Sequence, residues 1–186
     1  MHPVARSSTR LALRELAIED VDMVLAIYGS PEATEHLSFE PRTRDQVAQI
    51  VTRSIAAATA DPRSEYALAV VKRDTDDLIG FGRIATDPHQ QRAATFGFAL
   101  RPDACGVGHG LETVLLLLGL GFETLALHRM WGARSPLNEA SAKTMAAAGM
   151  VEEGTIRGHI LKAGQWRDSV VHAMLADEWA TRAQTP

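Results

Sequence analysis

The alternation of apolar and polar residues predicts three secondary-structure elements in the first third of the chain. Over residues 9–15, leucines alternate with arginines, as they do in a strand with one buried face. Apolar residues then recur at helical spacing over residues 18–28. A second helix is expected over residues 43–59, because Thr43 can act as its N-cap and Gln46 stands at the position that completes a capping box.

Beyond residue 60, short apolar runs alternate with turns rich in Asp, Gly and Pro, which is typical of strands and hairpins. The expected strands are residues 66–71, 78–85, 94–100, 128–133, 152–160 and 169–175. Two more helices are expected at residues 111–125 and 139–148, and Gly149 ends the second of them. This order predicts an α+β (mixed α/β) fold with a mostly antiparallel central sheet flanked by helices.

The predicted helix at residues 111–125 is apolar on almost every side. Leu116, Leu117 and Leu120 lie outside its main apolar stripe. Such a helix is usually buried on two sides, so the sheet would cover one side and a neighbouring element or a second subunit the other. Because a soluble monomer rarely exposes a large apolar patch, we expect a homodimer.

Composition and charge narrow the class of protein. A length of 186 residues suits one domain, placed at residues 9–179 between flexible tails at 1–8 and 180–186. The net charge of −4 argues against a nucleic-acid partner. The longest apolar run, residues 113–122, is too short to span a membrane, and the start of the chain lacks the apolar core of a secretory signal. Together with a single cysteine, these features predict a cytoplasmic location.

Residues 98–112 are the most informative segment, because they combine a strand, a glycine-rich turn and a helix start. Gly106, Gly108 and Gly110 permit a tight turn and the close approach of a ligand, and the first N–H groups of the helix favour phosphate. A P-loop needs Lys and Ser or Thr after its last glycine, and a dinucleotide fingerprint needs a glycine where Leu111 stands. A shorter pyrophosphate turn remains, beside the alternative of an ordinary strand-to-helix connection.

Four segments, in this order, resemble the GCN5-related N-acetyltransferase superfamily. They are Arg-Pro-Asp-Ala-Cys-Gly-Val-Gly-His-Gly-Leu-Glu at 101–112, Leu-His-Arg at 127–129, Asn-Glu-Ala-Ser at 138–141 followed by Ala-Gly-Met at 148–150, and Gly-Gln-Trp-Arg-Asp at 164–168. The resemblance spans about residues 9–179 and points to the RimJ/RimL-type branch of ribosomal-protein N-terminal acetyltransferases. It implies a sheet that splays open after its fourth strand.

The resemblance also implies acetyl-CoA as cofactor and transfer of its acetyl group, by direct attack, to a primary amine of a peptide N-terminus or a small molecule. The backbone at 98–101 would pair with the pantetheine, the glycine turn would hold the pyrophosphate, and Asn138 and Ser141 would face the thiol end. The residues expected to bind the cofactor are Phe98, Ala99, Leu100, Arg101, Gly106, Val107, Gly108, His109, Gly110, Leu111, Asn138, Ser141 and Lys143. No metal site is expected.

This sequence departs from the superfamily at the positions of its usual acid and base. The fourth-strand glutamate is replaced by Thr95 or Phe96, and the tyrosine seven residues after Asn138 is replaced by Met145. The remaining candidates for catalysis are Glu40, on the loop that precedes the second long helix together with His36, and Ser135, at the end of the fifth strand. The departures keep a second hypothesis open, namely a non-catalytic acyl-CoA-binding regulatory module.

Overall fold

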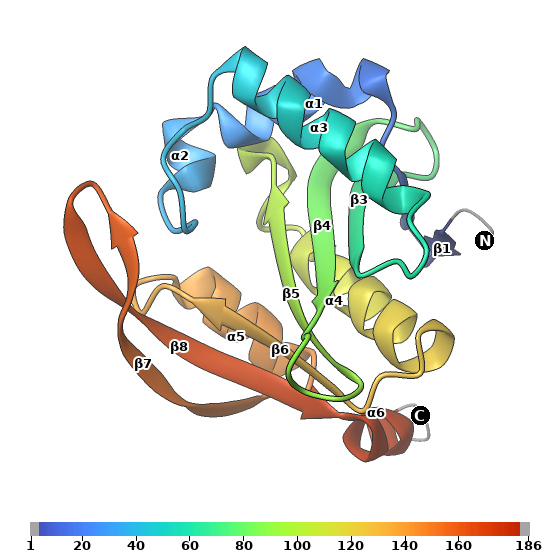
Figure 1. Ribbon diagram of the computed structural model, residues 1–186, viewed down its shortest axis with the longest axis vertical. Helices are drawn as coiled ribbons and strands as arrows, with labels where there is room; N and C mark the ends of the chain where they lie inside the picture. The colour runs from blue at the N-terminus through green and yellow to red at the C-terminus, as the bar shows by residue number, and fades with distance from the viewer. Residues whose placement is uncertain (1–3, 183–186) are drawn as a thin grey trace.

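The computed structural model describes residues 4–182, which fold around one sheet of eight strands in the order β1-β2-β3-β4-β5-β6-β8-β7 (Figure 1). Neighbouring strands are antiparallel except β5 and β6, which are parallel. The strands are β1 (Ala5–Ser7), β2 (Leu11–Glu15), β3 (Glu65–Lys72), β4 (Leu78–Thr86), β5 (Ala93–Leu100), β6 (Arg129–Arg134), β7 (Val151–Lys162) and β8 (Gln165–Leu175). The predicted α+β class is confirmed.

Helices cover both faces of this sheet. They are α1 (Val21–Tyr28), α2 (Pro31–Thr34), α3 (Arg44–Ala58), α4 (His109–Gly119), α5 (Glu139–Ala147) and α6 (Ala176–Arg182). Short turns of helix precede α1 at η1 (Ile18–Asp20) and follow β5 at η2 (Pro102–Ala104). The Thr43 hydroxyl accepts a hydrogen bond from the Gln46 N–H, and the Gln46 Oε1 accepts one from the Thr43 N–H, so the predicted capping box begins α3.

The chain has more regular structure at its two ends than the sequence indicates. Residues 5–7, placed in the predicted N-terminal tail, form β1 and pair with β2. Helix α6 reaches Arg182, inside the predicted C-terminal tail. A three-residue strand is too short to show a period, and its order comes from pairing with a distant partner. The remaining tail residues, 1–3 and 183–186, lie outside the part of the chain that the structure describes.

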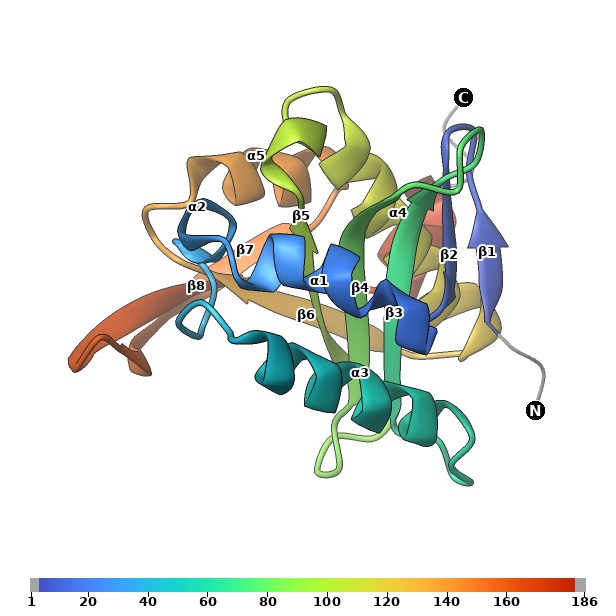
Figure 2. The ribbon, with the colours of Figure 1, turned by 90° about the horizontal axis from the view of Figure 1, so that it is seen from above.

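The sheet separates two apolar cores, and β3 contributes to both. Successive side chains of a strand point to opposite faces. One set of β3 residues packs with α4 and α5 (Tyr66, Leu68, Val70), and the alternate set packs with α1 and α3 (Ala67, Ala69, Val71). Figures 1 and 2 show the two helix pairs on opposite sides of the sheet. Burial on both faces explains why β3 reads as a continuous apolar run.

Helix α4 is covered within the chain. It continues into a turn of π-helix, η3 (Leu120–Thr124), and it packs against β2, β4, β5 and α5. Leu116, Leu117 and Leu120 are at most 4% exposed. Because these leucines already have partners, the apolar excess of this helix does not require a second subunit, and that argument for a homodimer no longer holds.

The sheet opens between β5 and β6. The two strands pair only from Ala93 to Thr95, opposite Arg129 to Trp131. Beyond Thr95, β5 continues along β4 while β6 continues along β8, so a gap forms in the middle of the sheet (Figure 1). The splay that the resemblance implies is therefore present.

Candidate functional site

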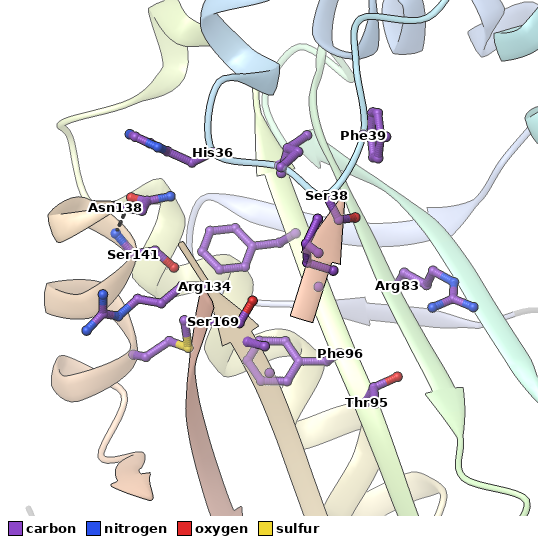
Figure 3. A pocket seen from close by; sticks show the side chains of 18 of the residues that line it. His36, Ser38, Phe39, Arg83, Thr95, Phe96, Arg134, Asn138, Ser141 and Ser169 are labelled. Carbon is purple, nitrogen blue, oxygen red and sulfur yellow. Dashed lines mark hydrogen bonds between the residues drawn. The ribbon is translucent and has the colours of Figure 1, made fainter. Parts of the chain in front are cut away.

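A cavity of about 420 Å³ lies where β5 and β6 separate. Its walls come from β4, β5, β6, β7 and β8, from α5, and from the loop at residues 36–39. Figure 3 shows His36 and Ser38 on that loop, Asn138 and Ser141 on α5, and Arg83 on β4 around one space. A cavity of this size suits a small molecule or the end of a longer one.

The edge of β5 that faces the gap carries unpaired backbone groups. The N–H of Arg101 donates to the carbonyl of Ile79 on β4 at 2.8 Å. Backbone groups point alternately to the two sides of a strand, so the N–H groups of Leu100 and Phe98 point away from β4. They point to the side from which β6 has departed. This edge can pair with an extended ligand that carries amide groups.

The glycine turn lies between β5 and α4. Gly106 and Gly108 have φ angles of 80° and 87°, in the left-handed region that glycine adopts at little cost. Gly108 is the N-cap of α4, and no side chain caps this helix. A Cβ built on Gly106 would meet no atom within 4 Å. The first turn of α4 therefore presents uncapped N–H groups beside open space, which suits a phosphate.

Contacts from the β1–β2 turn hold the start of α4 in place. The Glu112 carboxylate accepts hydrogen bonds from the Ser8 hydroxyl at 2.5 Å, the Arg10 N–H at 2.8 Å and the Arg10 Nε at 2.7 Å. Arg10 also donates through Nη1 to the carbonyl of Val107 at 2.9 Å. Arg10 thus places a cation beside the turn from a distant part of the sequence.

Asn138 both caps α5 and lines the cavity. Its Oδ1 accepts a hydrogen bond from the Ser141 N–H at 2.9 Å, and both residues border the open space (Figure 3). Asn138 is therefore the N-cap of α5. Met145, one turn further along α5, is 3% exposed and also lines the cavity, so no proton donor stands at that position.

A family model described as an acetyltransferase (GNAT) domain matches residues 10–151. The chain belongs to the GNAT acetyltransferase family. It is therefore an acetyl-CoA-dependent N-acetyltransferase by family, and the gap along β5 with the uncapped turn before α4 fits the pantetheine and pyrophosphate of CoA. This GNAT domain transfers acetyl groups to an amine, which is the general activity of the family.

Comparison with individual proteins supports this assignment. The chain is 25% identical over 171 residues to an uncharacterized N-acetyltransferase, p20, of Bacillus licheniformis, which covers 92% of this chain and 96% of that protein. Its fold is similar to that of Mycobacterium smegmatis RimJ in complex with CoA-disulfide, with a TM-score of 0.82 at 20% identity over 96% and 91% of the two chains. It is also similar to spermidine N-acetyltransferase from Vibrio cholerae in complex with CoA and spermine, with a TM-score of 0.81 at 20% identity over 93% and 99%.

The expected cofactor residues of this GNAT domain lie along the end of β5, in the turn before α4, and in and just before α5. Phe98 and Ala99 line the cavity, while Leu100 and Arg101 continue the same edge of β5 toward η2. Val107 is 58% exposed and Lys143 is exposed, so both side chains are accessible from solvent. Gly106, Gly108, Gly110 and Leu111 form the turn and the start of α4.

The side chain of His109, one of the residues expected to bind the cofactor, points into the protein. It is 9% exposed, and its Nδ1 lies 3.1 Å from the carbonyl oxygen of Ala104. The imidazole therefore fastens the turn to η2 from inside. The reason is local geometry, because the first residue of α4 points its side chain back toward the preceding turn.

The two expected catalytic residues do not line the cavity. Glu40 is exposed, one position beyond Phe39, which does line it. Ser135 is 1% exposed, and its hydroxyl accepts a hydrogen bond from the Leu137 N–H at 3.4 Å. Ser135 thus shapes the turn before α5. From the same loop as Glu40, His36 reaches the cavity (Figure 3).

Basic residues of the cavity wall were missed by the sequence analysis. Arg83, Arg134 and Arg167 line the cavity, together with His36 and His159. Arg83 is the one charged residue in the apolar run of β4, which is a signal that the sequence did contain. For Arg134 and Arg167 no local signal exists, because only the pairing of β6 with β8 and of β8 with β7 decides which way they face.

The tip of the β7–β8 hairpin is fastened to the loop that borders the cavity. Lys162 donates from Nζ to the carbonyl oxygens of Thr34 at 2.6 Å and Glu35 at 2.7 Å, and it lies 3.4 Å from that of Leu37. Figure 1 shows the hairpin reaching toward α2. Burial lowers the pKa of Lys162, and the charges of Glu40, Arg167 and Glu35 have smaller effects on it. This bridge links two segments more than a hundred residues apart.

Residues 4–182 contain neither a metal-binding cluster nor a helix able to span a membrane. No group of three or more His, Cys, Asp or Glu side chains is arranged to hold a metal ion there. Among the helices of this part of the chain, none combines the length and the apolar content needed to cross a membrane.

Proposed function

We propose that this GNAT domain binds acetyl-CoA along the gap-facing edge of β5 and transfers the acetyl group to a primary amine that enters the cavity beside residues 36–39. The observation that carries the proposal is the run of unpaired N–H groups at Phe98 and Leu100, which ends at an uncapped glycine turn. A pantetheine arm needs such a run of backbone partners, and a pyrophosphate needs such a turn.

The reaction is a direct displacement. The amine nitrogen gives its lone pair to the acetyl carbonyl carbon, so a C–N bond forms and the C–S bond breaks. The electron pair of the C–S bond stays on sulfur, which ends as the thiol after the nitrogen has lost its proton. The N–H of Leu100 would donate to the carbonyl oxygen, where negative charge develops in the transition state. Holding amine and thioester together supplies the rest of the rate gain.

The lining of the cavity favours a neutral amine. Among the described residues that line it, three are arginines and none is Asp or Glu. No carboxylate on this wall therefore stabilises the ammonium form, so the acceptor amine keeps a lower pKa than it would have beside a carboxylate. Glu40, exposed at the end of the loop, keeps its proposed role of taking the released proton through water.

The acceptor is proposed to be a peptide N-terminus or a small amine. The proteins with similar folds include RimJ, which belongs to the branch that the sequence resembles, and spermidine N-acetyltransferase, which is named after a small amine. The RimJ/RimL-type resemblance favours the α-amine of a protein. A cytoplasmic location and a homodimer remain parts of this proposal.

Release of free thiol from acetyl-CoA, with a panel of amines and peptides, tests the function. Leu100→Pro removes one N–H that β4 does not use, and Leu100→Ala keeps that N–H as the matched control. We expect turnover with at least one acceptor, and a loss of about a hundredfold in kcat for Leu100→Pro but not for Leu100→Ala. Tight CoA binding without thiol release from any acceptor would instead favour the non-catalytic acyl-CoA-binding module.

A further inference from the structure

The charge of the cavity wall is one-sided, and this bears on the acceptor of the proposed reaction. Arg83, Arg134, Arg167, His36 and His159 line the cavity, and no carboxylate among the described residues does. A polyamine would meet no counter-charge on this wall. An acceptor with an anionic group would meet the opposite situation.

Two of the three arginines are already neutralised. Arg83 forms two hydrogen bonds to the Glu65 carboxylate, at 2.8 and 3.1 Å. Arg134 lies 3.2 Å from a carboxylate oxygen of Glu152 and donates to His172. Each of these two guanidinium groups has its counter-ion on the protein, so neither needs one from a ligand.

Arg167 is the exception. Within residues 4–182 its side chain forms no ion pair and no hydrogen bond, and its Nε is buried without a partner. Burial lowers the pKa of Arg167, which means that its surroundings disfavour the cation. A buried donor on a charged group is costly to leave unpaired. A ligand oxyanion at this position would offset that cost.

A second unpaired polar atom lies on the neighbouring strand. Arg167 is paired across the hairpin with Ile160, the neighbour of His159, and the Nδ1 of His159 is also buried without a partner. Ser169 stands two residues after Arg167 on β8, so both side chains point to the same face, and both line the cavity (Ser169 in Figure 3). A guanidinium, a hydroxyl and an imidazole whose Nδ1 can carry a proton thus line the same cavity, and groups of these kinds can bind an oxyanion.

We propose that the acceptor amine carries a carboxylate or phosphate group, and that Arg167, assisted by His159, binds this group while the amine points toward the β5 edge. The proposal rests on the proposed acetyl transfer and narrows its acceptor to anionic amines. A planar guanidinium matches both carboxylate and phosphate.

The test compares acceptors that differ only in the anionic group. The pairs are free amino acids with their carboxamides, O-phosphoethanolamine with ethanolamine, and short peptides that begin with Asp or with Asn; spermidine serves as a cationic acceptor. The variant is Arg167→Gln. The matched control is Arg157→Gln, because Arg157 is exposed on the same hairpin and does not line the cavity.

We expect the anionic member of at least one pair to give the higher kcat/KM. Arg167→Gln should lower that value by about tenfold or more and leave the neutral member unchanged, since a hydrogen bond to a charged group is lost. Arg157→Gln should behave like the natural chain. A preference for the neutral amines or for spermidine, or an equal loss on both members of a pair, would overturn the proposal. The pair that discriminates most identifies the source of the oxyanion.

A binding measurement separates failure of this inference from failure of the proposed function. Calorimetric titration of the CoA-loaded protein with N-acetyl amino acids and with their carboxamides needs no turnover. Binding of the carboxylate form that weakens in Arg167→Gln supports the site even where no thiol is released. Equal binding of the two forms in the natural chain contradicts it, whatever the outcome of the transfer assay.

Discussion

The side chain of Asn138 caps α5 and also lines the cavity. Its Oδ1 accepts from the Ser141 N–H, while the side chain as a whole borders the cavity. Aspartate caps a helix as well as asparagine does. Substitution by Asp therefore keeps the cap and replaces the amide donor by a negative charge.

We expect Asn138→Asp to melt within a few degrees of the natural chain but to bind acetyl-CoA about tenfold more weakly. Asn138→Ala should lose stability as well, by about 1 kcal/mol, because it removes the cap. Differential scanning calorimetry and equilibrium binding measure the two effects separately. Unchanged acetyl-CoA affinity in the Asp variant would show that the cap is the only role of Asn138.

His172 makes the stability of the fold depend on pH. It is 3% exposed on β8, and Arg134 donates to its Nε2 at 3.1 Å, so the proton of the neutral ring lies on Nδ1. Burial, with the charge of Arg134, lowers the pKa of His172 from its ordinary value of 6.5, while Glu152 opposes the shift. The unfolded chain then binds the proton more readily than the folded chain.

Stability from His172 is therefore complete above about pH 6.5 and is lost as the pH falls through the lowered folded pKa. His172→Gln keeps an oxygen that can accept from Arg134 and does not titrate. We expect urea unfolding at about pH 7.5 and about pH 5.5 to show a smaller loss of stability for His172→Gln than for the natural chain. Equal losses in the two proteins would contradict the assignment.

At the scale of elements, the β7–β8 hairpin and the loop after α2 form one side of the cavity only because they are joined. Lys162 supplies that joint through carbonyl oxygens of Thr34 and Glu35. Carbonyl oxygens that follow a helix end carry partial negative charge, which suits an ammonium group. Without the bridge, residues 36–39 would have no polar tie to the hairpin tip.

We expect Lys162→Met to raise the KM for the acceptor several-fold, while the Kd for CoA stays unchanged because the glycine turn is held by other contacts, those of Glu112. Hydrogen exchange of residues 35–39 should become faster. Lys162→Arg keeps the charge and the donors, so it should recover part of the acceptor affinity. A rise in the KM without faster exchange would mean that Lys162 acts on the acceptor and not on the loop.

At the scale of the whole molecule, the homodimer remains a prediction, but the apolar surface of α4 no longer supports it. The leucines of α4 are buried against the chain's own sheet and α5. Light scattering over the micromolar range decides the question without reference to any interface. A mass of two chains would confirm the homodimer, and a mass of one chain at every concentration would contradict it.

The sequence by itself determined the elements and the cofactor side of the site. The signals for them are local, since each acts within a few residues. They are the period of two or 3.6 residues, the capping pair Thr43 and Gln46, and the glycines before α4. The glycine turn that we propose as the phosphate site could be located for the same reason, since strand, turn and helix follow one another along the chain.

Only the tertiary structure decided the acceptor side. The cavity wall brings together residue 36, residue 83, residues 131–134 and residues 159–169. Which of their side chains face inward depends on strand register, and a shift of one residue would turn each of them to the other face. Arg167 pairs across β7 and β8, and Lys162 reaches the loop after α2, through contacts that no local pattern encodes. Burial and charge at Arg167 exist only once those distant segments have met.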